Sequence, residues 1–430
     1  MSHRSRELTV SGLSRVEGEG ALRLTVRGGQ VDRAELNIYE PPRFFEAFLR
    51  GRSYTEPPDI TARICGICPV AYQTSACNAI EQACGVVLDQ PLAELRRLLY
   101  CGEWISSHAL HIYFLHAPDF LGYPDSITLA QDHRDIVERG LALKKAGNAI
   151  LEFLGGRAIH PVNVRVGGFY RVPARSELAP LAEQLRQALD LAVSTVQWAA
   201  SFDFPDLEIG YDLLSAHDPG RYPVESGDLR SASGLSFPAC EFPDHVTEEQ
   251  VPHSTALHAT LDGHRYLAGP LARYSLNSGA LSPIAREAAA SAGLGVECRN
   301  PFRSVLVRAV EVVYAVEEAL RIIGSYQRPD RPAVEVTPRA GTGHGVSEAP
   351  RGLLYHRYAL DADGLIQAAT IIPPTSQNQA AIEDDLRRVA EANLGLGDDA
   401  LTDLCERVIR NYDPCISCAT HFLTLTVNHA

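Results

Sequence analysis

Two cysteine pairs lie near opposite ends of the chain, in Arg63-Ile64-Cys65-Gly66-Ile67-Cys68-Pro69 and in Asp413-Pro414-Cys415-Ile416-Ser417-Cys418-Ala419-Thr420-His421. Two Cys-x-x-Cys pairs can supply four thiolates to a soft transition metal. A zinc ribbon or knuckle takes both pairs from one short module, whereas nearly the whole chain separates these two. If the pairs bind one metal site, the fold must bring the two ends of the chain together at a buried point.

The sequence around the pairs predicts strands first and long helices afterwards. Glycines 28 and 29 mark a hairpin turn between alternating segments, and prolines and glycines delimit the helices. A capping box, Ser376-x-x-Gln379, starts one of them. We expect strands at 8–10, 20–26 and 31–38, an extended segment at 161–171, and mostly loops and short strands at 202–295. We expect helices at 69–84, from 91 to before Pro118, and at 131–154, 177–201, 301–323, 376–395 and 399–411.

The expected fold class is α+β and predominantly α. No internal repeat, low-complexity tract or linker divides the sequence, and the two ends must meet, so we expect one intertwined domain over residues 1–430. The helical periodicity permits a core of long helices, with an N-terminal antiparallel β region and further β segments at the periphery.

Composition excludes some classes of function. The chain has 430 residues and a net charge of −14, which argues against a nucleic-acid surface. No membrane span is expected, because charged or histidine residues interrupt the apolar helices (His111, His116, Arg308, Glu311). Residues 1–7 are polar and lead into no apolar signal region, so we expect a cytoplasmic protein. In that reducing compartment, paired cysteines indicate metal binding rather than disulfides.

The two pairs have features that favour thiolates. Pro69 and Pro414 each suggest that a helix starts at the motif, with Asp413 as a cap of the second, and a helix start lowers the pKa of a nearby thiol. On the pairs alone, a structural zinc tetrathiolate is an equally good interpretation. The other six cysteines are not part of a Cys-x-x-Cys pair, and we expect them to be small buried hydrophobic residues.

Further sequence blocks accompany the cysteine pairs. Together with them, these blocks resemble the large, catalytic subunit of nickel–iron hydrogenases over most of the chain, and the resemblance implies that family's fold. The blocks are Arg15-Val16-Glu17-Gly18-Glu19-Gly20, Phe45-Glu46 before Gly51-Arg52, Glu348-Ala349-Pro350-Arg351-Gly352, and Pro374-Thr375 with Asn378.

The resemblance implies a nickel–iron centre whose iron carries two cyanides and one carbon monoxide. Cys65 and Cys415 would bind nickel terminally, while Cys68 and Cys418 would bridge nickel and iron. Glu17 would take the proton from Cys415, although in isolation it would be a surface glutamate of a polar hairpin.

The remaining implied residues surround this centre. Arg351 would lie over the open metal position, with Asp119 and Asp413 pairing with it; without the family frame it would be a surface arginine in a turn. The Pro374-Thr375 segment would hold a cyanide. A separate Mg²⁺ or Fe²⁺ ion would be bound by Glu46, His421 and the backbone carbonyl near Ile371, because oxygen-rich coordination suits magnesium.

The resemblance implies an enzyme that interconverts dihydrogen with protons and electrons. An iron–sulfur small subunit would take the electrons, and maturation proteins would assemble the centre. The motifs are most like the soluble branch that adds flavin- and NAD(P)-binding and iron–sulfur diaphorase subunits, some members of which also reduce sulfur. Another soluble acceptor (a deazaflavin, ferredoxin or polysulfide) is the alternative. Two rival classes are the quinone-module subunit of respiratory complex I, which lacks the four cysteines, and a structural zinc protein.

Overall fold

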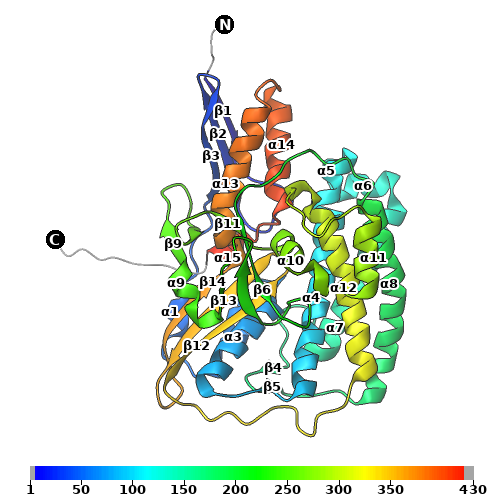
Figure 1. Cartoon of the computed structure of the whole chain (residues 1–430), viewed down its shortest axis with the longest axis vertical. Coiled ribbons are helices and arrows are strands. Elements are labelled where there is room, and N and C mark those ends of the chain that lie inside the picture. Colours follow the sequence, from blue (N-terminus) through cyan, green and yellow to red (C-terminus); the bar gives the residue numbers. More distant parts are fainter. Residues whose placement is uncertain (1–4, 421–430) are drawn as a thin grey trace, which may run out of the picture.

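The computed structural model describes residues 5–420. Its N-terminal part is an antiparallel sheet of β1 (Arg6–Val10), β2 (Gly20–Arg27) and β3 (Gln30–Ile38). Leu22 and Leu24 lie opposite Leu36 and Ala34 and are buried, because alternate residues of a strand share one face. This face packs on α13 (Pro374–Ala392), and the sheet, α13 and α14 (Asp398–Asn411) form the projecting upper part of the molecule (Figure 1).

Long helices lie side by side on the opposite flank of the molecule (Figure 1). They are α4 (Gln90–Leu110), α7 (Arg134–Gly155), α8 (Ala179–Ala199) and α12 (Ser304–Ser325). Helix α12 is buried along most of its length. Helices α4 and α7 cross closely at Gly102 and Gly147. The crossing requires glycine at position 147, since a Cβ atom there would lie 2.6 Å from the carbonyl oxygen of Gly102. The expected fold class, a mainly helical α+β protein with an N-terminal antiparallel sheet, is confirmed.

A three-stranded meander connects the helical flank to the cysteine centre. Its strands are β12 (Gly341–Ala349), β13 (Gly352–Leu360) and β14 (Ile366–Ile372), and they pack on α3 (Pro69–Cys84). The contact is possible because β12 has no side chain at two points: a Cβ atom on Gly343 would lie 1.8 Å from the carbonyl oxygen of Ala79, and one on Gly345 would lie 2.2 Å from that of Ser75.

Most predicted helices are confirmed, but several boundaries were wrong. Helix α4 does not end the helical path before Pro118, since a π-helical turn over His111–His116 carries it into α5 (Ala117–Leu121), where Pro118 occupies the first turn. Helix α13 begins at Pro374, so Ser376 is not its cap. Helix α12 continues through Gly324. The loop-rich region 202–295 also contains three α-helices, the short α9 (Phe242–His245), α10 (Pro270–Asn277) and α11 (Pro283–Ser291).

The remaining elements are short. They are α1 (Phe45–Leu49), α2 (Pro57–Thr61), α6 (Ser126–Asp132), α9 (Phe242–His245), α15 (Ile416–Ala419), β4 (Val164–Arg165), β5 (Gly168–Phe169), β6 (Asp212–His217), β7 (Asp228–Ser231), β8 (Ser236–Phe237), β9 (Val246–Gln250), β10 (Leu257–Leu261) and β11 (Tyr266–Leu267). Within residues 5–420, none of the helices has the length and apolar character that crossing a membrane requires.

Candidate metal centre

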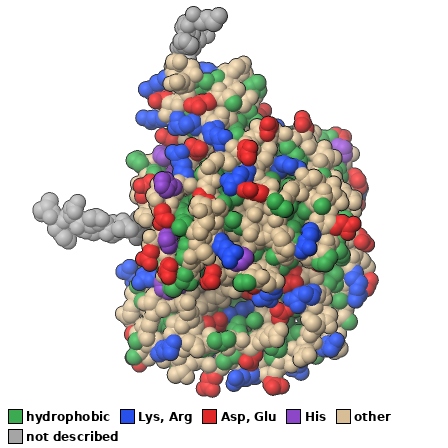
Figure 2. Space-filling model, in the orientation of Figure 1, with side chains coloured by type: hydrophobic (Ala, Val, Ile, Leu, Met, Phe, Trp, Pro, Cys, Tyr) green, Lys and Arg blue, Asp and Glu red, His purple; other side chains and the backbone are tan. Residues whose placement is uncertain are grey.

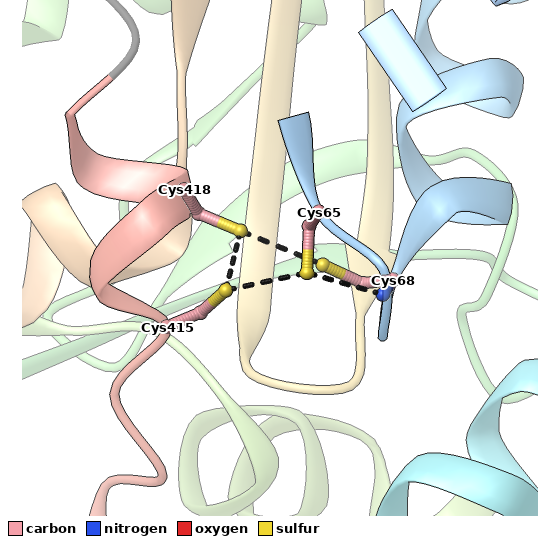
Figure 3. A group of neighbouring side chains, drawn as sticks. All are labelled: Cys65, Cys68, Cys415 and Cys418. Carbon is pink, nitrogen blue, oxygen red and sulfur yellow. Dashed lines mark hydrogen bonds between the residues drawn. The ribbon is translucent and has the colours of Figure 1, made fainter. Parts of the chain in front are cut away.

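The four cysteines of the two pairs converge at one point (Figure 3). The sulfurs of Cys65 and Cys415 are 3.4 Å apart, those of Cys68 and Cys418 are 3.6 Å apart, and those of Cys415 and Cys418 are 2.7 Å apart. All four residues are at most 3% exposed. Each pair thus presents both sulfurs to the same enclosed point, as the sequence predicted.

Local backbone structure orients the first pair. Cys65 is extended, and Cys68 occupies the position before α3, with Pro69 in the first helical turn. The backbone N–H groups of Ile67 and Cys68 donate to the Cys65 sulfur over 3.2 and 3.4 Å. Such donors stabilise a thiolate. The predicted helix start at Pro69 is confirmed, while the two N–H donors belong to the residues just before the helix.

The second pair is oriented differently from the expectation. Helix α15 begins only after Cys415, so Pro414 does not open it and Asp413 does not cap it. Asp413 instead has a left-handed backbone with φ of 50°, and its side chain is buried against Arg351. The short α15 presents Cys418 beside Cys415.

The N-terminal region holds the second pair in place. Glu17 forms a β-bridge with Cys415, and its carbonyl accepts from the N–H of Ile416 over 3.0 Å. Arg43 joins both cysteine loops, because its guanidinium donates to the carbonyls of Ile64 and Ser417. The sequence analysis missed Arg43, although it lies within a few residues of the Phe45-Glu46 block.

Arg351 is the cation beside the sulfurs. It follows strand β12, is 2% exposed, and donates from Nε to the Asp413 carbonyl over 2.7 Å and from Nη2 to Oδ1 of that residue over 3.2 Å. Its Nη1 atom is buried and has no hydrogen-bond partner among residues 5–420. Arg351 also interacts electrostatically with Cys415, Cys68 and Cys65. The expected pairing of Arg351 with Asp413 is therefore present.

Asp119 does not pair with Arg351, which corrects the expectation. Its carboxylate accepts from Arg15 over 2.6 Å and from Arg410 over 2.7 and 2.9 Å. Burial opposes its ionisation, but the charge and hydrogen bonds of Arg410, together with the charges of His116 and Arg15, outweigh burial and lower the pKa of Asp119. Asp119 thus connects Arg15 to Arg410 in the last turn of α14.

Glu17 and Thr375 contact the Cys415 residue itself. The Cys415 sulfur donates to Oε2 of Glu17 over 3.1 Å, and the same oxygen accepts from the N–H of Ser417 over 3.1 Å. Glu17 is half-buried, so it lies between the centre and solvent. The N–H of Cys415 donates to the Thr375 hydroxyl over 3.0 Å, and Pro374 begins the helix that carries Thr375.

The pKa values of the Cys65 and Cys415 thiols shift in opposite directions in this buried cluster. Hydrogen bonds from the other thiols, that of Cys415 foremost, hold the pKa of Cys65 well below its usual value, whereas burial raises the pKa of the Cys415 thiol well above its own. Several thiolates cannot coexist in one dry pocket without compensating positive charge. A metal ion bound by the four sulfurs supplies that charge, and the donor set fits a soft transition metal such as nickel or iron.

A second group of oxygen donors lies apart from the cysteines. The Ile371 N–H donates to Oε1 of Glu46 over 2.7 Å, so these two predicted residues do meet. Burial raises the pKa of Glu46 to about 7 and that of Glu248, on β9, to about 8, and the two carboxylates interact. The sequence analysis missed Glu248. The third predicted ligand of the Mg²⁺ or Fe²⁺ ion is the side chain of His421, which lies outside the described residues.

A buried ionic network supports the Arg351 turn. Arg273 of α10 donates to Glu311 over 2.9 Å and to Glu348 over 3.0 Å, and also to the carbonyls of Ala349 and Pro350. Arg273, Glu311 and Glu348 are all fully buried. A signal for this network existed in the sequence, since Glu311 interrupts an otherwise apolar helix.

Similarity to known proteins agrees with this geometry. The family model described as nickel-dependent hydrogenase matches residues 43–136 and 301–421. Sulfhydrogenase 1 subunit alpha of Pyrococcus furiosus is 34% identical over 97% of this chain and 98% of its own length. The beta subunit of the NAD-reducing hydrogenase HoxS of Cupriavidus necator is 28% identical, over 97% of this chain and 95% of its own.

A solved structure shares the fold over nearly the full length. It is that of an NAD⁺-reducing [NiFe]-hydrogenase in the H2-reduced state, with a TM-score of 0.86 and 28% identity, covering 97% of this chain and 99% of the other. Structures of [NiFeSe]-hydrogenases match with TM-scores of 0.79 and 0.80 at 20% and 23% identity, which concerns the fold alone.

Proposed function

The chain belongs to the nickel-dependent hydrogenase family as a large subunit, and from that premise we propose that it cleaves dihydrogen reversibly and heterolytically at a nickel–iron centre. The observation that carries the proposal is the convergence of four buried sulfurs beneath an arginine with one unpartnered nitrogen. Cys65 and Cys415 would bind nickel terminally, and Cys68 and Cys418 would bridge it to an iron with two cyanides and one carbon monoxide. That centre, when bound, supplies the Lewis acidity that polarises the H–H bond.

The surrounding residues hold and orient the reacting groups. Arg351 keeps its charge in this pocket, and its Nη1 atom is available to a substrate or to an anionic ligand of iron. Asp413 fixes the plane of the Arg351 guanidinium, because it accepts hydrogen bonds from the Nε and Nη2 atoms of Arg351. The Thr375 hydroxyl, which already accepts from Cys415, retains a proton to donate to a cyanide.

Glu17 gives the proton a route out of the centre. The proton moves from the Cys415 sulfur to Oε2 of Glu17, which it already contacts over 3.1 Å. A general base must lie within such reach of the proton it accepts. Because Glu17 is half-buried, the same carboxyl group can release the proton toward solvent.

The second metal in this proposal is Mg²⁺ or Fe²⁺. Glu46, the Ile371 backbone and His421 would hold it. Burial raises the pKa of Glu46 to about 7, and a bound cation would favour the charged form of this carboxylate. Oxygen ligands of this kind suit magnesium.

For the acceptor, we favour NAD(P)⁺, reached through an iron–sulfur small subunit and flavin-binding diaphorase subunits. The support is the similarity to the NAD-reducing enzymes over nearly the full length; similarity to a sulfhydrogenase subunit favours polysulfide as a second candidate. We place the enzyme in the cytoplasm, a reducing compartment in which cysteines stay as thiols or bind metals, and none of the ten cysteines, all within residues 5–420, forms a disulfide.

The acceptor proposal is tested by purifying the chain with its native partner subunits. Hydrogen-dependent reduction is measured with NAD⁺, NADP⁺, polysulfide, a ferredoxin and a deazaflavin in parallel. We expect NAD⁺ or NADP⁺ to be reduced fastest. Preferential reduction of any of the other three would replace NAD(P)⁺ as the acceptor, while hydrogen oxidation itself would stand.

A further inference from the structure

We propose that His253, His258 and Glu383 form a separate binding site for a divalent transition cation of the zinc class. One ligand atom from each of these residues lies within 4.8 Å of the ligand atoms of the other two. None of them is used by the hydrogenase chemistry. They come from three parts of the fold: the loop after β9, strand β10 and helix α13.

His258 is the residue that an ordinary ion pair does not explain. The Nε2 atom of His253 lies 2.7 Å from Oε1 of Glu383, and these two side chains alone could be a half-buried salt bridge. His258, in contrast, is only 5% exposed, and its buried Nε2 atom has no hydrogen-bond partner in the part of the chain that the structure describes. An unsatisfied buried nitrogen is costly, and a metal ion would satisfy it.

The local charges and geometry suit such an ion. Glu35 interacts with His253, and Glu249 with His258, as negative charges, and the positive charge of Arg23 acts against them at His253. Two imidazoles and one carboxylate are a common ligand set for zinc and neighbouring metals, with positions left for water.

The site is ordered on one side and accessible on the other. Glu383 also accepts from the N–H of Leu36 over 2.9 Å, and the hairpin loop is anchored to β3 by the N–H of Thr255, which donates to the carbonyl of Ile38 over 2.7 Å. His253 lines a surface cavity of about 890 Å³, which gives an ion a path of entry. Histidine side chains gather along this edge of the molecule, over the region of β9 (Figure 2).

A bound ion would fasten the β9–β10 hairpin to α13. The first turn of α13 carries Thr375, which contacts Cys415, and Glu383 lies further along the same helix. The site would therefore stabilise the helix that borders the hydrogenase centre without contacting that centre.

Zinc binding to the metal-loaded full chain tests the proposal. After treatment with a chelator, the protein is titrated with Zn²⁺ and its metal content is measured. We expect about one additional Zn²⁺ per chain, with zinc K-edge absorption showing nitrogen and oxygen at about 2.0–2.1 Å and no sulfur. Zinc bound to sulfur at about 2.3 Å, or no additional zinc, would overturn the proposal.

Variants locate the ion. H253A and E383Q alter half-buried side chains and should weaken Zn²⁺ binding by at least about tenfold, since each removes one of three protein ligands. H245A is the matched control, because His245 pairs with Asp262 outside the cluster and should bind Zn²⁺ like the parent. Equal Zn²⁺ affinity in H253A, E383Q and the parent would refute the assignment.

Discussion

At the scale of residues, specific hydrogen bonds hold two of the cysteines in the centre, Cys65 and Cys415. Cys65 accepts two backbone N–H groups, and Cys415 is held by Thr375 and Glu17. The convergence of the four cysteines was predictable, because the two Cys-x-x-Cys pairs occur together with the other motifs of the family, in the family's order along the chain. Contacts such as Asp119 with Arg410 could not be predicted, because a Pro-Asp dipeptide carries no information about a helix that ends almost 300 residues later.

The four-sulfur assignment is tested by replacing one cysteine. C415S should lose nickel and hydrogen turnover, because a serine hydroxyl is a poor ligand for a soft metal. The measurement is metal content together with hydrogen uptake.

A matched control is available in the chain. Cys405 is fully buried in α14 but lies outside the cluster, so C405S should keep nickel. Stoichiometric nickel and full turnover in C415S would show that Cys415 is not a ligand.

Arg351 should be required for turnover but not for metal binding. R351K keeps the charge and loses the planar set of donors that contacts Asp413 and presents Nη1. We expect normal nickel and iron content and a fall in turnover of about 10²–10³-fold, as for loss of one donor at a reaction centre. An unchanged rate in a metal-replete variant would remove Arg351 from the mechanism.

Glu17 should be required for proton release but not for cleavage. E17Q keeps size and hydrogen bonding but cannot carry a proton. Hydrogen–deuterium exchange with solvent and net hydrogen oxidation should fall by about 10²–10⁴-fold, while conversion of para- to ortho-hydrogen largely persists. Exchange with solvent at the parent rate would mean that the proton leaves by another route.

At the scale of elements, the contact between α3 and the β12–β13 meander positions two parts of the centre. Helix α3 begins after Cys68, and Arg351 follows β12. The sequence predicted α3 to the residue, since Pro69 and Gly85 bound it. It did not predict the π-helical turn after α4 or the start of α13, because buried contacts override local capping signals.

A methyl group on β12 tests that contact. G343A would place a Cβ atom 1.8 Å from the Ala79 carbonyl oxygen, so α3 and β12 must separate. We expect destabilisation of about 1–3 kcal/mol or more in thermal or denaturant unfolding, together with lower nickel retention.

The matched control lies on the same strand. A Cβ atom on Gly341 would meet its nearest neighbour only at 3.4 Å, so G341A should lose much less stability. Equal stability of the two variants would mean that close packing at Gly343 does not hold α3 in place.

At the scale of the whole molecule, the fold closes on itself through its two ends. Arg6 in β1 pairs with Asp398 over 2.6 Å, and Glu17 bridges to Cys415. The sequence predicted this meeting from the cysteine pairs together with the family motifs around them. The path of residues 202–295 could not be predicted, since short segments carry little periodicity. The organisation as one domain over residues 1–430 stays a prediction.

The most direct test of the central claim is infrared spectroscopy of the purified protein, combined with its metal content. We predict bands from two cyanides and one carbon monoxide on iron, with nickel and iron in equal amounts. Zinc in place of nickel, with no cyanide or carbon monoxide band, would contradict the account and leave the four cysteines as a structural zinc site.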